Sequence, residues 1–112
     1  MLQRVHIQIL DNPYEEFLYD WDRSGIPLTN RELAEELRKE MDYFYPSVVF
    51  VEYIDLFLDD EEDFGEIREM LRLGVIDTPV VLINGVIKIY GTLSPSTIKR
   101  EVEKLVSSGP LH

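Results

Sequence analysis

The stretch Ile76–Gly91, "IDTPVVLINGVIKIYG", decides the fold of this chain. It holds two apolar runs separated by Asn84-Gly85, a pair that is typical of a two-residue β-hairpin turn. Such a turn needs positive φ at both central positions, and asparagine and glycine accept that conformation most readily. Pro79 opens the first run, where the absence of a backbone N–H is tolerated. The stretch therefore predicts two antiparallel strands.

Two further strands are predicted upstream of the hairpin. Residues 4–10, "RVHIQIL", alternate apolar and polar side chains, which indicates a strand with one buried face. Residues 47–57, "SVVFVEYIDLF", are almost continuously apolar. That pattern is typical of a parallel strand that is covered on both faces.

Helices are predicted between and after these strands. Thr29 followed by Glu32 is a capping box that starts a helix, and Pro46 ends it. Its apolar stripe is Leu33, Leu37, Met41 and Phe44. A second helix falls within residues 58–74, and a third follows Ser94-Pro95. An optional short helix is predicted after Asn12-Pro13, with Tyr14, Phe17, Leu18 and Trp21 at helical spacing.

The order of the predicted elements defines an α/β fold, β-α-β-α-β-β-α. A β-α-β unit makes its two strands parallel through a right-handed crossover, and the hairpin adds an antiparallel pair. We expect a four-stranded mixed sheet flanked by helices. With 112 residues the chain is predicted to be a single domain, 1–112, with a loose tail at 106–112.

The composition restricts the classes of partner. Acidic residues outnumber basic ones by 22 to 11, which gives a formal net charge of −11. Nucleic acid and anionic membranes are therefore disfavoured, because binding to phosphates needs clustered Lys and Arg. No apolar run is long enough to span a bilayer, and no signal peptide is recognised at the N-terminus. A cytoplasmic protein is expected.

The chain contains no cysteine. A disulfide, a thiolate nucleophile and a cysteine-ligated metal or iron–sulfur site are thereby excluded. His6 and His112 lie near opposite ends of the sequence and form no metal-ligand spacing. No phosphate-binding glycine loop is present. We expect neither a cofactor nor a metal.

The segment "DTPVVLINGVIKIYGTLSPSTIKREVEKL", residues 77–105, resembles the C-terminal half of a thioredoxin fold. Over nearly the whole chain, "IPLT" at 26–29, "YP" at 45–46 and "YID" at 53–55 resemble small bacterial thioredoxin-like proteins of the YuzD type. The resemblance implies a cis peptide bond at Thr78-Pro79, beside the place where relatives keep their active site. The alternative is that Pro79 merely starts an edge strand.

A catalytic role is not expected. Relatives with redox activity place two cysteines after the first strand, and only a thiolate performs disulfide exchange. A hydroxyl of Tyr14 or Ser24 could polarise a thiol substrate, but transferases of that kind need a second helical domain. Neighbouring acids such as Glu15-Glu16 do not face one site on a helix. We predict no catalytic residues.

Two kinds of function remain. The first is a protein- or peptide-binding module that uses the groove beside Pro79, where an extended segment can pair like an added strand. Acidic neighbours of this groove would favour a basic partner. The second is a homodimer through a sheet edge formed by the second or fourth strand, or a small-molecule binder. The predicted groove residues are Asn12, Pro13, Tyr14, Trp21, Asp77, Thr78 and Pro79.

Overall fold

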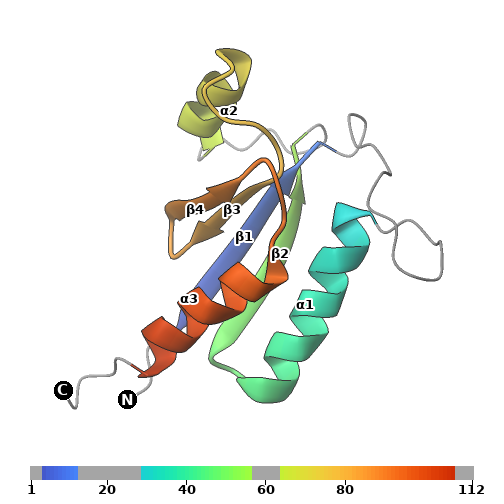
Figure 1. Cartoon of the computed structure of the whole chain (residues 1–112), viewed down its shortest axis with the longest axis vertical. Helices are drawn as coiled ribbons and strands as arrows, with labels where there is room; N and C mark the ends of the chain where they lie inside the picture. Colours follow the sequence, from blue (N-terminus) through green and yellow to red (C-terminus); the bar gives the residue numbers. More distant parts are fainter. Residues whose placement is uncertain (1–3, 13–28, 57–63, 108–112) are drawn as a thin grey trace.

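The computed structural model describes residues 4–12, 29–56 and 64–107. Within them the chain is an α/β protein with a four-stranded mixed sheet and three helices (Figure 1). In chain order the elements are β1 (Val5–Asp11), α1 (Asn30–Phe44), β2 (Val49–Asp55), α2 (Gly65–Arg72), β3 (Val80–Ile83), β4 (Val86–Tyr90) and α3 (Pro95–Ser107). The short helix predicted after Asn12-Pro13 lies outside the described residues.

The strands are ordered β2-β1-β3-β4 across the sheet. β1 pairs with β2 in parallel and with β3 in antiparallel fashion, and β3 pairs with β4 in antiparallel fashion. The two edges are therefore β2 and β4, as expected. Because Leu10 of β1 lies opposite Val80 of β3, the beginning of β3 lies at the same end of the sheet as the carboxyl ends of β1 and β2.

Two separate cores lie on the two faces of the sheet. The larger one packs α1 and α3 against one face, and Figure 1 shows these two helices side by side over the strands. Val5, Ile7 and Ile9 supply the β1 side chains of this core. The smaller core packs α2 against the other face and includes Leu10 of β1. The alternation of side chains along β1 divides them between the two cores.

Local sequence signals account for the ends of the elements. The Thr29 side chain accepts a hydrogen bond from the Glu32 backbone N–H (3.1 Å), which caps α1 as expected. Asn84 and Gly85 have φ values of 52° and 83°. Both positions of the hairpin turn thus have the positive φ that the sequence predicts.

Three expectations about burial and boundaries are wrong. Phe44 is 62% exposed, because α1 ends there and the side chain lies beyond the sheet-facing stripe. The second strand is not covered on both faces: α2 has only eight residues, and Phe50 of β2 is 46% exposed. The loose tail begins later than residue 106, since α3 continues to Ser107 and Val106 packs against the larger core.

Candidate functional site

The carboxyl end of β1 holds a buried charge. Asp11 is 1% exposed and is the only buried polar or charged side chain among the described residues. It continues the inward-facing series of β1, and its backbone carbonyl accepts a hydrogen bond from the Leu56 N–H (2.8 Å). A carboxylate at such a place needs a hydrogen-bond donor, because burying it without one is costly.

Tyr53 of β2 supplies that donor. Its hydroxyl donates to Oδ2 of Asp11 over 2.8 Å. The guanidinium of Arg31, in the first turn of α1, lies over the Tyr53 ring, 5.2 Å from the ring centroid. One guanidinium nitrogen of Arg31 is 4.0 Å from Oδ2 of Asp55 at the end of β2. Three elements therefore contribute to one polar cluster, which we call the Asp11 cluster: Asp11, Arg31, Tyr53 and Asp55.

The loop that enters β3 lies at this same end of the sheet. The peptide bond between Thr78 and Pro79 is cis. The Gly91 N–H donates to the carbonyl oxygens of both Asp77 and Pro79, each at 2.9 Å, which fixes the loop to the end of β4. Gly91 has a φ of 83°, a conformation that glycine adopts without steric cost.

Thr78 differs from its two neighbours in this loop. Its backbone N–H and C=O have no hydrogen-bond partner within the described part of the chain, although the carbonyls on both sides of it are bonded to Gly91. The residue is half-buried, while Asp77 is exposed and Pro79 is buried. A free donor and a free acceptor on one residue, beside an ordered strand end, can pair with another extended backbone.

The structure brings several of the predicted groove residues together. Asn12 directly follows Asp11, and the pairing of Leu10 with Val80 places it at the end of the sheet that also carries Thr78 and Pro79. Asn12 is half-buried. Three of the predicted residues lie outside the described residues: Pro13, Tyr14 and Trp21.

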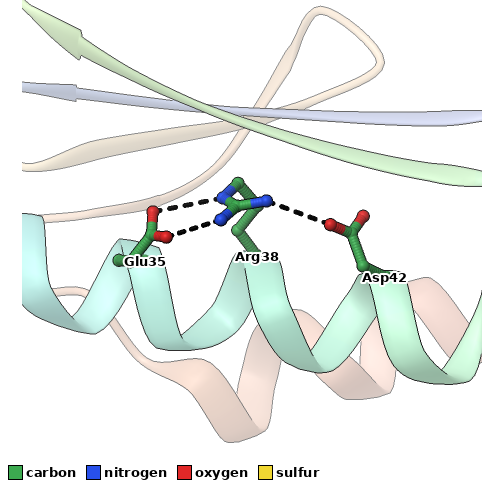
Figure 2. Close-up of polar contacts among 3 residues, drawn as sticks. All are labelled: Glu35, Arg38 and Asp42. Atoms are coloured by element: carbon green, nitrogen blue, oxygen red, sulfur yellow. Dashed lines mark hydrogen bonds and ion pairs between the residues drawn. The ribbon is translucent and has the colours of Figure 1, made fainter.

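A further set of charges lies along α1 on the side that faces β2. Arg38 donates from Nε to Glu35 (3.1 Å) and from a terminal nitrogen to Asp42 (3.0 Å), as Figure 2 shows. The hydrogen bond from Arg38 lowers the pKa of Glu35, and the same bond raises the pKa of Arg38. Glu35 and Arg38 also line a crevice of about 80 Å³ between α1 and β2 that reaches Arg31 and Tyr53.

Sequence reasoning did not identify Asp11, Tyr53 and Arg31 as a cluster. One signal was present, since Asp11 occupies an inward position of β1 in phase with Val5, Ile7 and Ile9. An acid in that phase indicates a buried carboxylate. Its partner could not be identified without the register, which places Asp11 opposite Asp55 and two residues from Tyr53.

Within the described residues, no group of three or more metal-ligating side chains is found, and no helix there is long and apolar enough to cross a membrane. The Asp11 cluster is held by the hydrogen bond from Tyr53 to Asp11, the cation–π contact of Arg31 with Tyr53 and the ion pair of Arg31 with Asp55. Its chemistry is that of orientation and recognition of charged or hydrogen-bonding groups.

Comparison with known proteins gives a match in structure alone. No family model matches this sequence, and no curated protein matches it. The fold is similar to that in the crystal structure of a protein of unknown function from Staphylococcus aureus, with a TM-score of 0.67. The two sequences are 14% identical, and the match covers 96% of this chain and 95% of the other. At that identity the likeness shows that the two chains share a fold.

Proposed function

We propose that this chain is a non-catalytic, thioredoxin-like protein that binds an extended segment of a protein partner along Thr78. The strand order β2-β1-β3-β4, with α1 and α3 on one face and α2 on the other, supports the thioredoxin-like assignment. The complete absence of cysteine removes the disulfide chemistry of that fold. A scaffold of this kind can retain a binding surface after its reaction is lost.

The observation that carries this proposal is the free backbone of Thr78. A partner strand would accept a hydrogen bond from the Thr78 N–H and donate one to the Thr78 C=O. The two backbones would then form a short antiparallel pair beside the start of β3. The side chain of Asp77, which has no partner among the described residues, is exposed next to it. With the net charge of −11, this carboxylate favours a partner segment that carries Lys or Arg.

A homodimer through a sheet edge is the second candidate. The observation in its favour is the β4 edge, where Val86 and Tyr90 are both more than half exposed. Symmetric antiparallel pairing of two β4 strands about their centre would set Lys88 opposite Lys88 of the second copy. Like charges directly opposite one another destabilise such a pair, so we prefer the partner-binding function.

The test uses the full chain with two matched variants. Thr78→Arg places a long charged side chain over the free backbone, whereas Thr92→Arg adds the same side chain to a nearby exposed loop position. Partners captured from a cell lysate with the wild-type protein should be retained by Thr92→Arg and lost with Thr78→Arg. Both variants are first shown to be folded by their circular dichroism spectra.

Amide hydrogen exchange on the purified complex then tests the backbone pairing itself. The Thr78 amide should exchange more slowly in the complex than in the free protein, because its N–H gains an acceptor. Unchanged exchange at Thr78, or equal capture by both variants, would contradict the proposal. Light scattering over a range of protein concentrations separates the second candidate, since a homodimer would double the mass without any partner.

A further inference from the structure

Among the described residues, α2 covers only part of the sheet face on which it packs. The strand register places Leu82 of β3 beside Gln8 of β1 and opposite Ile87 of β4, and Gln8 lies opposite Glu52 of β2. These four residues form one row across the sheet. The neighbouring row, which includes Leu10 and Val80, belongs to the core beneath α2. Leu82 also belongs to this core and Ile87 packs against it, whereas Gln8 and the exposed Glu52 do not, so among the described residues this row marks the edge of the part that α2 covers.

A cavity of about 320 Å³ lies at this border, between α2 and the sheet. Its apolar walls come from the helix layer and from the strands: Phe64, Ile67, Met70, Leu82 and Ile87. The remaining lining residues are Gln8, Glu66 and Gly85. Cavities from about 300 Å³ upward with apolar walls and a few polar groups are typical sites for small molecules.

Both polar side chains of this cavity offer hydrogen-bond acceptors. The Gln8 amide nitrogen is directed to Oε1 of Glu52 (3.4 Å), so the amide leaves its carbonyl oxygen without a partner in the described part of the chain. The carboxylate of Glu66 likewise has no hydrogen bond or ion pair to any described residue. By contrast Glu69, one turn further along α2, is paired with Arg72. Glu66 is exposed, so its carboxylate is accessible to a cationic donor that enters the cavity, and the Gln8 carbonyl oxygen is a second acceptor.

We propose that this cavity binds a small molecule with an apolar body and one ammonium group. The apolar body would cover Ile67, Leu82 and Ile87, and the ammonium would donate to Glu66 and Gln8. An anionic ligand would meet a carboxylate and an acceptor oxygen, which is unfavourable. The overall charge of −11 also raises the local concentration of cations around the protein.

A second crevice, of about 440 Å³ between α1 and α3, is a weaker candidate for such a ligand. Two of its charged side chains are paired with each other, since Nζ of Lys99 is 2.7 Å from Oε2 of Glu40. A ligand that bound to either member of this pair would have to replace the existing ion pair. The cavity beneath α2 makes no such demand, and it lies on the face of the sheet opposite the Asp11 cluster.

The experiment titrates the full chain, labelled with ¹⁵N, with three probes that share one phenyl group: 2-phenylethylammonium, 2-phenylethanol and 3-phenylpropionate. The ammonium probe should shift the amide resonances of Gln8, Ile67 and Leu82 and should bind several times more tightly than the alcohol. The propionate should bind more weakly than both. Absence of shifts at these amides, or equal affinity for the three probes, would overturn the proposal.

A matched pair of variants on α2 tests the role of the carboxylate. Glu66→Gln should lower the affinity for 2-phenylethylammonium by roughly threefold to fivefold, as expected for one partly exposed ion pair, and should leave the affinity for the alcohol unchanged. Glu69→Gln removes the same charge from α2 outside the cavity and should change neither affinity. Equal effects of the two variants would show general electrostatics instead of a site. Binding of a lysine-containing peptide but not of the free amine would also overturn a small-molecule ligand, in favour of a protein partner.

Discussion

Asp11, the only buried polar side chain among the described residues, makes a contact with Tyr53 whose contribution to stability can be predicted. Tyr53→Phe removes the hydroxyl that donates to the Asp11 carboxylate and leaves that charge buried without its donor. The free energy of unfolding should fall by about 1–3 kcal/mol. Urea denaturation measures the change, and Tyr43→Phe, at a position that is 80% exposed, is the control that should have almost no effect.

A double variant sharpens this test. If the contact between Asp11 and Tyr53 is the cause, Asp11→Asn combined with Tyr53→Phe should cost less than the sum of the two single changes. Strict additivity would mean that the tyrosine hydroxyl stabilises the protein through some other group.

The conformation of residues in local sequence signals could be predicted, whereas contacts that depend on the strand register could not. Asn84 and Gly85 reveal their conformation through turn chemistry alone, and both have the positive φ that this chemistry requires. Thr78 was placed in the candidate groove by resemblance. That its N–H and C=O have no partner in the described part of the chain depends on the hydrogen-bond pattern of the folded loop, and no sequence pattern contains that information.

Glycines at two element boundaries should respond in opposite ways to alanine. An added Cβ meets no atom within 4 Å at either Gly65 or Gly85, so steric contact does not distinguish them. Gly85 has a φ of 83°, and Gly85→Ala should destabilise the hairpin by about 1–2 kcal/mol. Gly65 begins α2 at negative φ, and Gly65→Ala should stabilise the protein by about 0.4–1 kcal/mol. Thermal unfolding of the two variants checks the signs, and a loss at both positions would refute this explanation.

The charges along α1 predict a pH dependence. The folded-state pKa of Glu35 lies below its ordinary value of 4.5, mainly because Arg38 donates a hydrogen bond to it. The stabilisation that this bond provides is therefore complete above the ordinary value and is lost as the pH falls through the lowered one. The difference in unfolding free energy between wild type and Arg38→Gln should be present at pH 7 and should shrink below pH 4.5.

Denaturation curves recorded from neutral to acidic pH measure this difference. Arg100→Gln, on α3, removes an equal charge from a position without a carboxylate partner among the described residues. The difference in unfolding free energy between Arg100→Gln and wild type should not change as the pH falls through the pKa of Glu35. Parallel curves for the two variants would show that Arg38 acts only through the net charge.

The helices and strands could be predicted from the sequence more fully than the burial of their faces. The order of strands and helices follows from the two periodicities and from capping and turn residues. The apolar run of β2 predicted that both faces of the strand are buried. Such a run, however, indicates only that the segment forms a strand. The cover depends on the length of α2, and its eight residues leave Phe50 exposed.

The molecule as a whole carries an excess of negative charge that should make it more stable in salt. At a formal charge of −11 the carboxylates repel one another in the folded state. An increase of NaCl from about 0.01 M to about 0.1 M shortens the screening length from about 30 Å to about 10 Å. The melting temperature should rise, because salt weakens the repulsion between carboxylates more than it weakens the exposed ion pairs, each of which contributes little to stability. Differential scanning calorimetry with NaCl and with KCl measures it, and a fall with either salt would contradict the prediction.

The division of the interior into two unequal cores has a kinetic consequence. α2 and its small cluster can detach from the sheet without disturbing the contacts of α1 and α3, since the strands separate the two sets of side chains. We therefore expect the two layers to open as distinct units, and amide protons of α2 should exchange with solvent sooner than those of β1. A molecule bound beneath α2 would oppose the detachment of this helix from the sheet. Binding should therefore be detected as slower amide exchange in α2, without a change in the exchange of α1 and α3.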